Sequence, residues 1–113
     1  MKHLLSILTL LFVVCACGGN DVNEKAARML SDARTALKYG HYSEAKDSIL
    51  SLRQQYPTAI EARKQAILLL DSIEMIAAAD SMQHAQGEEW ERLHIKQQFF
   101  ERKLLEDKKK DAE

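Results

Sequence analysis

The chain has 113 residues, and its 16 Lys and Arg side chains nearly balance its 17 Asp and Glu side chains. This balance excludes a strongly basic nucleic-acid-binding face, so nucleic acid is not an expected partner. One proline, four glycines and 29% charged residues are typical of a helical chain with a well-solvated surface. The composition therefore predicts an all-α protein with one modest core.

The first residues have the layout of a secretory signal peptide. Lys2 and His3 form a short basic start, residues 4–14 are apolar apart from two hydroxyl side chains, and small residues follow at Ala16 and Gly18. A helix over residues 4–17 would reach only about 21 Å, which is less than the roughly 30 Å hydrocarbon core of a bilayer. We therefore expect residues 1–16 to be a cleaved signal peptide rather than a membrane span.

Residues 14–17, Val-Cys-Ala-Cys, resemble the lipobox of bacterial lipoproteins, in which an aliphatic and a small residue precede an obligatory cysteine. The resemblance implies that Cys17 receives a diacylglyceryl group and that cleavage follows Ala16, so Cys15 leaves with the signal peptide. Two alternatives stay open. One is cleavage after Ala16 by the ordinary signal peptidase; the other is a disulfide between the two cysteines, which would be strained with one residue between them.

A lipidated Cys17 would make the lipid bilayer a partner, because two or more acyl chains hold a protein stably on a membrane. The resemblance thus implies a lipid anchor at the bacterial cell envelope. By analogy with lipoprotein sorting, Gly18 after the cysteine favours the outer membrane, and the lack of a dense acidic run favours its periplasmic face. Residues 17–23 are expected to form a flexible leash, since glycines and short polar residues favour turns.

Residues 24–57 predict two short antiparallel helices. Gly40 is expected to end the first helix, Ser43 to cap the second and Pro57 to stop it. Each helix has one apolar face with steps of three and four residues. These faces are Ala26, Leu30, Ala33 and Leu37 in the first helix, and Ala45, Ile49, Leu52 and Tyr56 in the second.

The segment KYGHYSEAKDSILSLRQQYP, residues 38–57, resembles a tetratricopeptide repeat, a helix pair roughly 34 residues long. Gly40, Tyr42, Ala45 and Pro57 hold the repeat's glycine, aromatic, alanine and proline positions. The final Tyr-Pro is similar to the tetratricopeptide lipoproteins that assist outer-membrane assembly. The resemblance implies that these four residues serve helix packing, and that binding would use a surface made by stacked units. No second repeat is legible after Pro57.

Residues 58–113 predict one long helix, with a break and fold-back near Gly87 as the alternative. Thr58 and Glu61 have the spacing of a capping box at its start, and Lys108 to Lys110 are expected to lie in a frayed, solvated end. The apolar residues form two seams. The first is Ala62, Ala66, Leu69, Ile73 and Ile76, and the second is Trp90, Leu93, Phe100 and Leu104.

Residues that could carry chemistry are few. Glu91 and His94 have the spacing of two metal ligands on one helical face, but a carboxylate-bridged metal site needs a second copy of this motif. No second copy, phosphate-binding glycine loop or nucleophile motif is legible. We therefore expect no enzymatic activity, no metal and no other cofactor, and keep a small metalloprotein only as a third hypothesis.

The leading hypothesis is a lipid-anchored helical adaptor that holds a partner protein at the envelope. Trp90, Phe99 and Phe100 are its candidate partner contacts, because large aromatic residues without an evident internal cover often carry binding energy. Packing of these three residues inside a helical hairpin is the open alternative. The alternative function is a self-associating structural spacer whose C-terminal helix forms a coiled coil.

Overall fold

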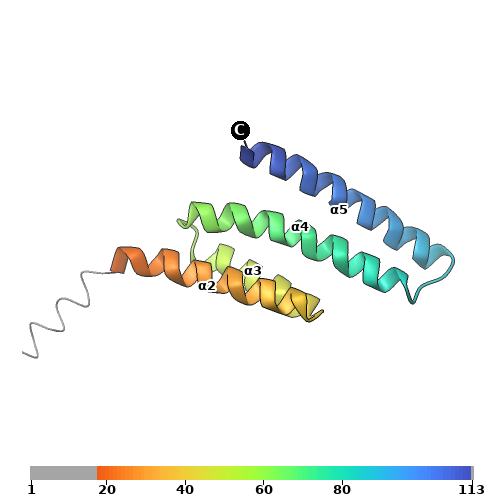
Figure 1. The fold of residues 1–113 in the computed structure, drawn as a ribbon, viewed down its shortest axis with the longest axis horizontal. Helices are drawn as coiled ribbons and strands as arrows, with labels where there is room; N and C mark the ends of the chain where they lie inside the picture. The colour runs from red at the N-terminus through yellow and green to blue at the C-terminus, as the bar shows by residue number, and fades with distance from the viewer. Residues whose placement is uncertain (1–17, 113) are drawn as a thin grey trace, which may run out of the picture.

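The computed structural model describes residues 18–112, which form four helices and no strand. The helices are α2 (Gly18–Lys38), α3 (Tyr42–Gln55), α4 (Ile60–Met82) and α5 (Glu88–Ala112). They make two successive antiparallel pairs, α2 with α3 and α4 with α5 (Figure 1). The prediction of an all-α fold is confirmed, whereas the signal peptide and Cys17 lie outside the described residues.

The expected leash is wrong for residues 18–23, which belong to the first turns of α2. The Asp21 carboxylate accepts from Lys25 Nζ at 3.0 Å, an ion pair four residues apart that favours helix. Asp21 also lies in the first turn, where the helix dipole stabilises negative charge. These two effects oppose the turn preference of Gly18 and Gly19.

The core of the first pair follows the predicted faces. α2 buries Ala26, Leu30 and Ala33 against Ala45, Ile49 and Leu52 of α3. Two further members of the predicted faces, Leu37 and Tyr56, pack at the edge of this core. Small alanines at 26, 33 and 45 let the two helix backbones approach closely. The helical periodicity therefore identified the packed faces correctly.

Gly40 ends α2 as predicted. Its φ of 77° is the left-handed conformation that a side chain disfavours. The Gly40 N–H donates to the Leu37 carbonyl at 3.0 Å, and the His41 N–H donates to the Ala36 carbonyl at 2.8 Å. These two bonds make a Schellman motif, which reverses the chain within three residues.

The predicted side-chain caps are wrong at both following helix starts. α3 begins at Tyr42 with His41 as its N-cap, and α4 begins at Ile60 with Ala59 as its N-cap; neither N-cap side chain makes a capping hydrogen bond. His41 closes the end of α2, so α3 starts before Ser43. Ala59 is buried in the core, and this tertiary contact places the start of α4 beyond Thr58.

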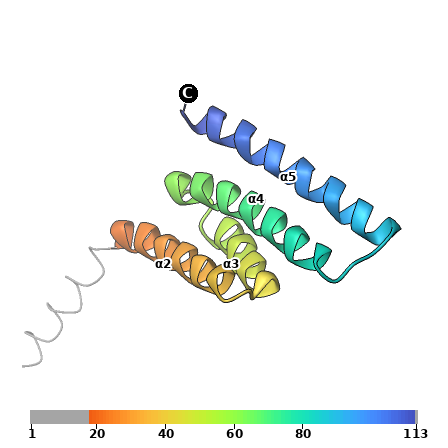
Figure 2. The ribbon, with the colours of Figure 1, turned by 45° about the vertical axis from the view of Figure 1, so that its right-hand side comes forward.

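The continuous helix over residues 58–113 is wrong, and the alternative fold-back is what the structure has. The chain leaves α4 after Met82, turns through residues 83–87 and returns as α5 alongside α4 (Figure 2). Gly87 has a φ of 64°. The reversal occurs because it covers the seam of α5, including buried Leu104, with the facing side of α4. Lys108 to Lys110 are exposed but helical rather than frayed.

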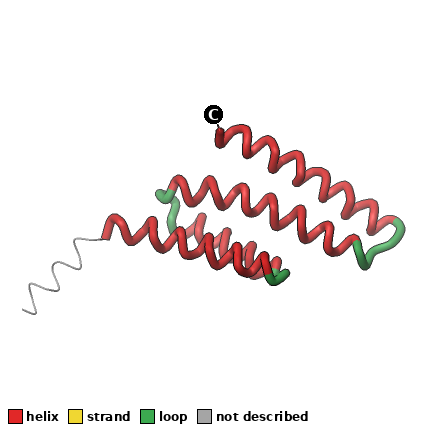
Figure 3. Tube along the Cα trace, in the orientation of Figure 1, coloured by secondary structure: helices red, strands yellow, loops and turns green. Residues whose placement is uncertain are grey.

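α5 lies at one side of the molecule. α4 packs against α2, α3 and α5, whereas α5 packs chiefly against α4. The short loops that join the helices lie at alternating ends of the bundle (Figure 3). Within residues 18–112, nothing covers the face of α5 that points away from α4.

Candidate interaction surfaces

The three aromatic residues predicted as partner contacts do not form one surface. Trp90 lies at the start of α5, with its ring 4.8 Å from the His94 ring, and is partly exposed. Phe99 is 55% exposed on the outer face, whereas Phe100 is half-buried toward α4; their rings meet edge to face at 5.1 Å. Consecutive helix residues point about 100° apart, so the structure separates what the sequence grouped.

Of the four residues of the repeat resemblance, Ala45 is buried and Tyr42 is half-buried, whereas Gly40 and Pro57 are exposed in turns. Ala45 is fully buried between the helices, and the Tyr42 hydroxyl donates to Asp80 Oδ2 at 3.2 Å, which ties the start of α3 to the end of α4. Burial, and then the negative Asp80, raise the pKa of Tyr42. The Pro57 carbonyl accepts from Arg63 Nη1 at 2.9 Å. Tyr42 and Pro57 thus make contacts with α4, whereas Gly40 lies in the turn of the first helix pair.

A charged cluster joins three helices at Glu74 of α4. The Glu74 carboxylate accepts from Lys46 of α3 and, at 3.2 Å, from Lys96 of α5, and its side chain is largely buried. Burial disfavours the ionised form, but the hydrogen bonds from the two ammonium groups outweigh it and lower the pKa of Glu74. This cluster stabilises the placement of α3 and α5 on α4 rather than forming a ligand site.

A second charged cluster lies between α4 and α5. Asp71 is 1% exposed and accepts from Lys103 Nζ at 2.9 Å, while the same ammonium donates to Asp107 Oδ2 at 2.8 Å. Burial, and then the neighbouring Asp107 carboxyl, raise the pKa of Asp71 to about 6, although Lys103 opposes the shift. The interaction with Asp71, and then the hydrogen bond from Lys103, lower the pKa of Asp107. Two carboxyl groups therefore compete for one cation.

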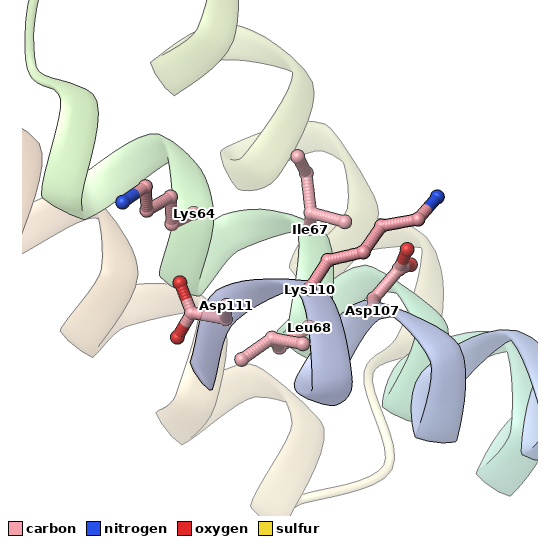
Figure 4. Close-up of a pocket in the computed structure, with 6 residues that line it drawn as sticks. All are labelled: Lys64, Ile67, Leu68, Asp107, Lys110 and Asp111. Carbon is pink, nitrogen blue, oxygen red and sulfur yellow. The ribbon is translucent and has the colours of Figure 1, made fainter. Parts of the chain in front are cut away.

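A small hollow lies between the start of α4 and the end of α5 (Figure 4). Ile67 and Leu68 are its apolar lining residues, and the other four are charged. Lys64 and Asp111 lie at one side of the hollow, and Lys110 and Asp107 at the other. A few apolar residues between opposite charges are typical of a helix–helix boundary.

A larger groove lies between α2 and α4, where the two helix pairs meet. Its apolar part includes Leu30, Ala62 and Ile60, and Ile60 is 63% exposed although it is a large apolar residue. Its polar part includes Arg34 and Glu61, and the remaining lining residues are Asn23, Ala27 and Gln65. No motif or periodicity in the sequence predicts this groove. Ile60 was the available signal, since it lies outside the predicted seam.

Comparisons with protein-family models, with curated proteins and with solved structures found no match to this chain. None of the helices α2 to α5 is both long and apolar enough to cross a bilayer. Within residues 18–112, no three His, Cys, Asp or Glu side chains converge as ligands of a metal ion. Glu91 and His94 lie on α5 without further candidate ligands in this part of the chain.

Proposed function

We propose that this protein is a lipid-anchored helical adaptor of the bacterial cell envelope, which binds a segment of a partner protein in the groove between α2 and α4. The observation that carries the proposal is the exposed Ile60 beside apolar Leu30 and Ala62, with Arg34 at the edge of the same groove. Apolar residues with a few polar groups around them are typical of binding sites for amphipathic segments.

The chemistry of the groove describes its occupant. An amphipathic segment would place apolar side chains over Ile60 and a carboxylate opposite Arg34, which has no ion-pair partner within residues 21–112. The resemblance of residues 38–57 to a tetratricopeptide repeat supports this choice, because such repeats bind through the surface of stacked helix pairs. The groove lies where the two pairs meet.

The proposed anchor would bring this groove close to a membrane. α2 begins at Gly18, directly after Cys17, and Asn23 of the groove follows five residues later, about 8 Å along the helix. A lipid on Cys17 would therefore hold the groove near the bilayer surface. A partner that is itself at the membrane fits this geometry best, and the proposal assigns the protein no catalytic role.

The alternative of a coiled-coil spacer has less support. It was suggested by an apolar seam on a continuous C-terminal helix. Three residues of that seam on α5, Leu93, Phe100 and Leu104, are buried or half-buried beside α4, and Trp90 is partly exposed. The fold-back at Gly87 also halves the reach of this region. The adaptor is therefore the function that the geometry favours.

The groove is tested with the full chain in its own membrane. A photo-crosslinking amino acid at Gln65, inside the groove, should link to another protein, whereas the same amino acid at exposed Gln54 of α3 should not. Ile60→Asp should remove the link, and Leu50→Asp, at a similarly exposed residue of α3, should keep it. Equal products from Gln65 and Gln54, or a link that survives Ile60→Asp, would contradict the proposal.

The anchor is tested by metabolic labelling with a radioactive fatty acid. Cys17→Ala should abolish labelling and release the protein from membranes, because the acylated thiol is lost. Cys15→Ala is the matched control and should leave labelling unchanged. A labelled Cys17→Ala variant would exclude the lipid-anchored form of the proposal while leaving the groove open to its own test.

A further inference from the structure

The outer face of α5 carries two large apolar residues that nothing in the described chain covers. Ile95 is 67% exposed and Phe99 is 55% exposed. They are four residues apart and so lie side by side on the helix surface. Leu104, which is buried against α4, lies on the other side of the helix.

Charged residues extend this apolar pair into a stripe along the whole helix. Its members recur at steps of three and four residues, so they share one face. All are exposed, and the charged ones make no ion pair within residues 21–112. The stripe consists of Glu88, Arg92, Ile95, Phe99, Arg102, Glu106 and Lys110.

Four of the five charged residues of the stripe lie symmetrically about Phe99. Arg92 and Glu106 each lie seven residues from Phe99, and Glu88 and Lys110 each lie eleven residues from it. Seven and eleven residues are close to two and three helical turns, so all four side chains point in nearly the same direction as Phe99. In each of these two pairs, the members have opposite charge.

We propose that a second copy of this chain docks antiparallel on the outer face of α5, with the two-fold axis at Phe99. In this arrangement, Phe99 meets Phe99 of the other copy, and Arg92 meets Glu106. Glu88 likewise meets Lys110, and each of these ion pairs occurs twice by symmetry. A parallel pair would instead place Glu88 to Glu91 against themselves and Lys108 to Lys110 against themselves.

A shallow hollow beside Phe99 fits the same occupant. All the residues that line it belong to α5, and they include Arg102 and Glu106, about one and two turns along from Phe99. In the antiparallel pair, this hollow faces residues 92–96 of the other copy, so Ile95 covers it. Ile95, the most exposed apolar residue of α5, would thereby be covered by the other copy.

The interface is small, since it involves one face of one helix. We therefore expect reversible pairing in the micromolar range or weaker rather than an obligate dimer. The stripe shares no residue with the groove between α2 and α4, so this inference does not rest on the proposed adaptor function.

Sedimentation equilibrium tests the pairing on purified residues 18–113. This polypeptide contains every described residue of the core, from Ala26 to Leu104, and cooperative unfolding followed by circular dichroism verifies that it is folded. We expect a monomer–dimer equilibrium that Phe99→Glu abolishes. Leu50→Glu, at a residue of α3 with similar exposure, should leave it unchanged.

Charge exchange tests the antiparallel register. Arg92→Glu and Glu106→Arg should each raise the dissociation constant by about tenfold or more, because each places like charges together. In an equimolar mixture of the two variants, the dissociation constant of the mixed dimer should be within about threefold of the value for the natural chain. The reason is that both contacts in the mixed dimer are again between opposite charges. Any of three results would overturn the proposal. The natural chain could remain a monomer at concentrations up to about 1 mM, Phe99→Glu and Leu50→Glu could have equal effects, or the mixture of charge variants could fail to pair.

Discussion

Replacing Asp71 by Asn is predicted to stabilise the protein at neutral pH. The carboxylate is buried, its Oδ1 accepts from Lys103, and its Oδ2 has no partner within the described residues. An asparagine has nearly the same shape. Its Oδ1 would still accept from Lys103, and its amide N–H could donate to the Asp107 carboxylate. The substitution thus removes a buried charge without leaving a cation unpaired.

The magnitude follows from the pKa of Asp71. The rise from 3.8 to about 6 corresponds to a cost of about 3 kcal/mol for the ionised group. Part of this cost is offset by Asp107, whose pKa is lowered by the same interaction. Burying an amide also costs free energy. We therefore expect Asp71→Asn to raise the free energy of unfolding by about 1–2 kcal/mol at neutral pH.

The effect should depend on pH with a defined sign. Below about pH 4, Asp71 is protonated in both the folded and unfolded chains, so ionisation contributes no difference. Between about pH 4 and pH 6, the unfolded chain loses this proton while the folded chain keeps it, so rising pH destabilises the natural protein. The advantage of Asp71→Asn should therefore grow across this window and stay level above it.

Urea unfolding followed by circular dichroism at several pH values measures the difference. Asp47→Asn, the same substitution at an exposed residue of α3, should change stability by less than about 0.5 kcal/mol throughout. A loss of 1 kcal/mol or more at neutral pH in Asp71→Asn would refute the reasoning, because the ion pair with Lys103 would then outweigh the desolvation of Asp71.

Two further predictions concern the turns and the close contact between helices. Ala45→Leu should overpack the contact of α2 with α3 and lower the free energy of unfolding by about 1–3 kcal/mol. Asp47→Leu, on the exposed side of α3, should lower it far less. Equal stability of the two variants would mean that the helices do not meet at Ala45. Gly87→Ala should cost about 1–2 kcal/mol, since its φ of 64° disfavours a side chain although an added Cβ would have no atom within 4 Å. Gly87→Asn should lower the free energy of unfolding less than Gly87→Ala, because asparagine tolerates this conformation better. If urea unfolding showed no loss of stability in Gly87→Ala, that result would argue against the reversal at this residue.

The helices of the first pair were predictable because their signals are local. Ala26, Leu30 and Ala33 recur at helical steps, and Gly40 supplies the left-handed residue that ends a helix. Their positions in the core follow from this periodicity, since a helix with one apolar face buries that face. The boundaries were less predictable, as the buried Ala59 shows, because a tertiary contact and not a side-chain cap places the start of α4.

The path of the second half could not be decided from the sequence. A glycine inside a helix costs only about 1 kcal/mol, so Gly87 permits either a continuous helix or a reversal. The reversal is decided by the burial that α4 and α5 give each other, which depends on residues distant along the chain such as Leu104. The groove at Ile60 and the stripe at Phe99 follow from this choice, because it determines which helix faces stay uncovered.

The sequence by itself determined the all-α class, the faces of the first helix pair and the cysteine context that predicts a lipid anchor, because each of these depends on residues close together in the chain. Only the tertiary structure decided the fold-back at Gly87, the burial of Asp71 beside Lys103 and the exposure of Phe99 beside the half-buried Phe100. The physical reason is that these features depend on which helices pack together. That choice is made by the total apolar surface removed from water, and no single segment of the sequence contains it.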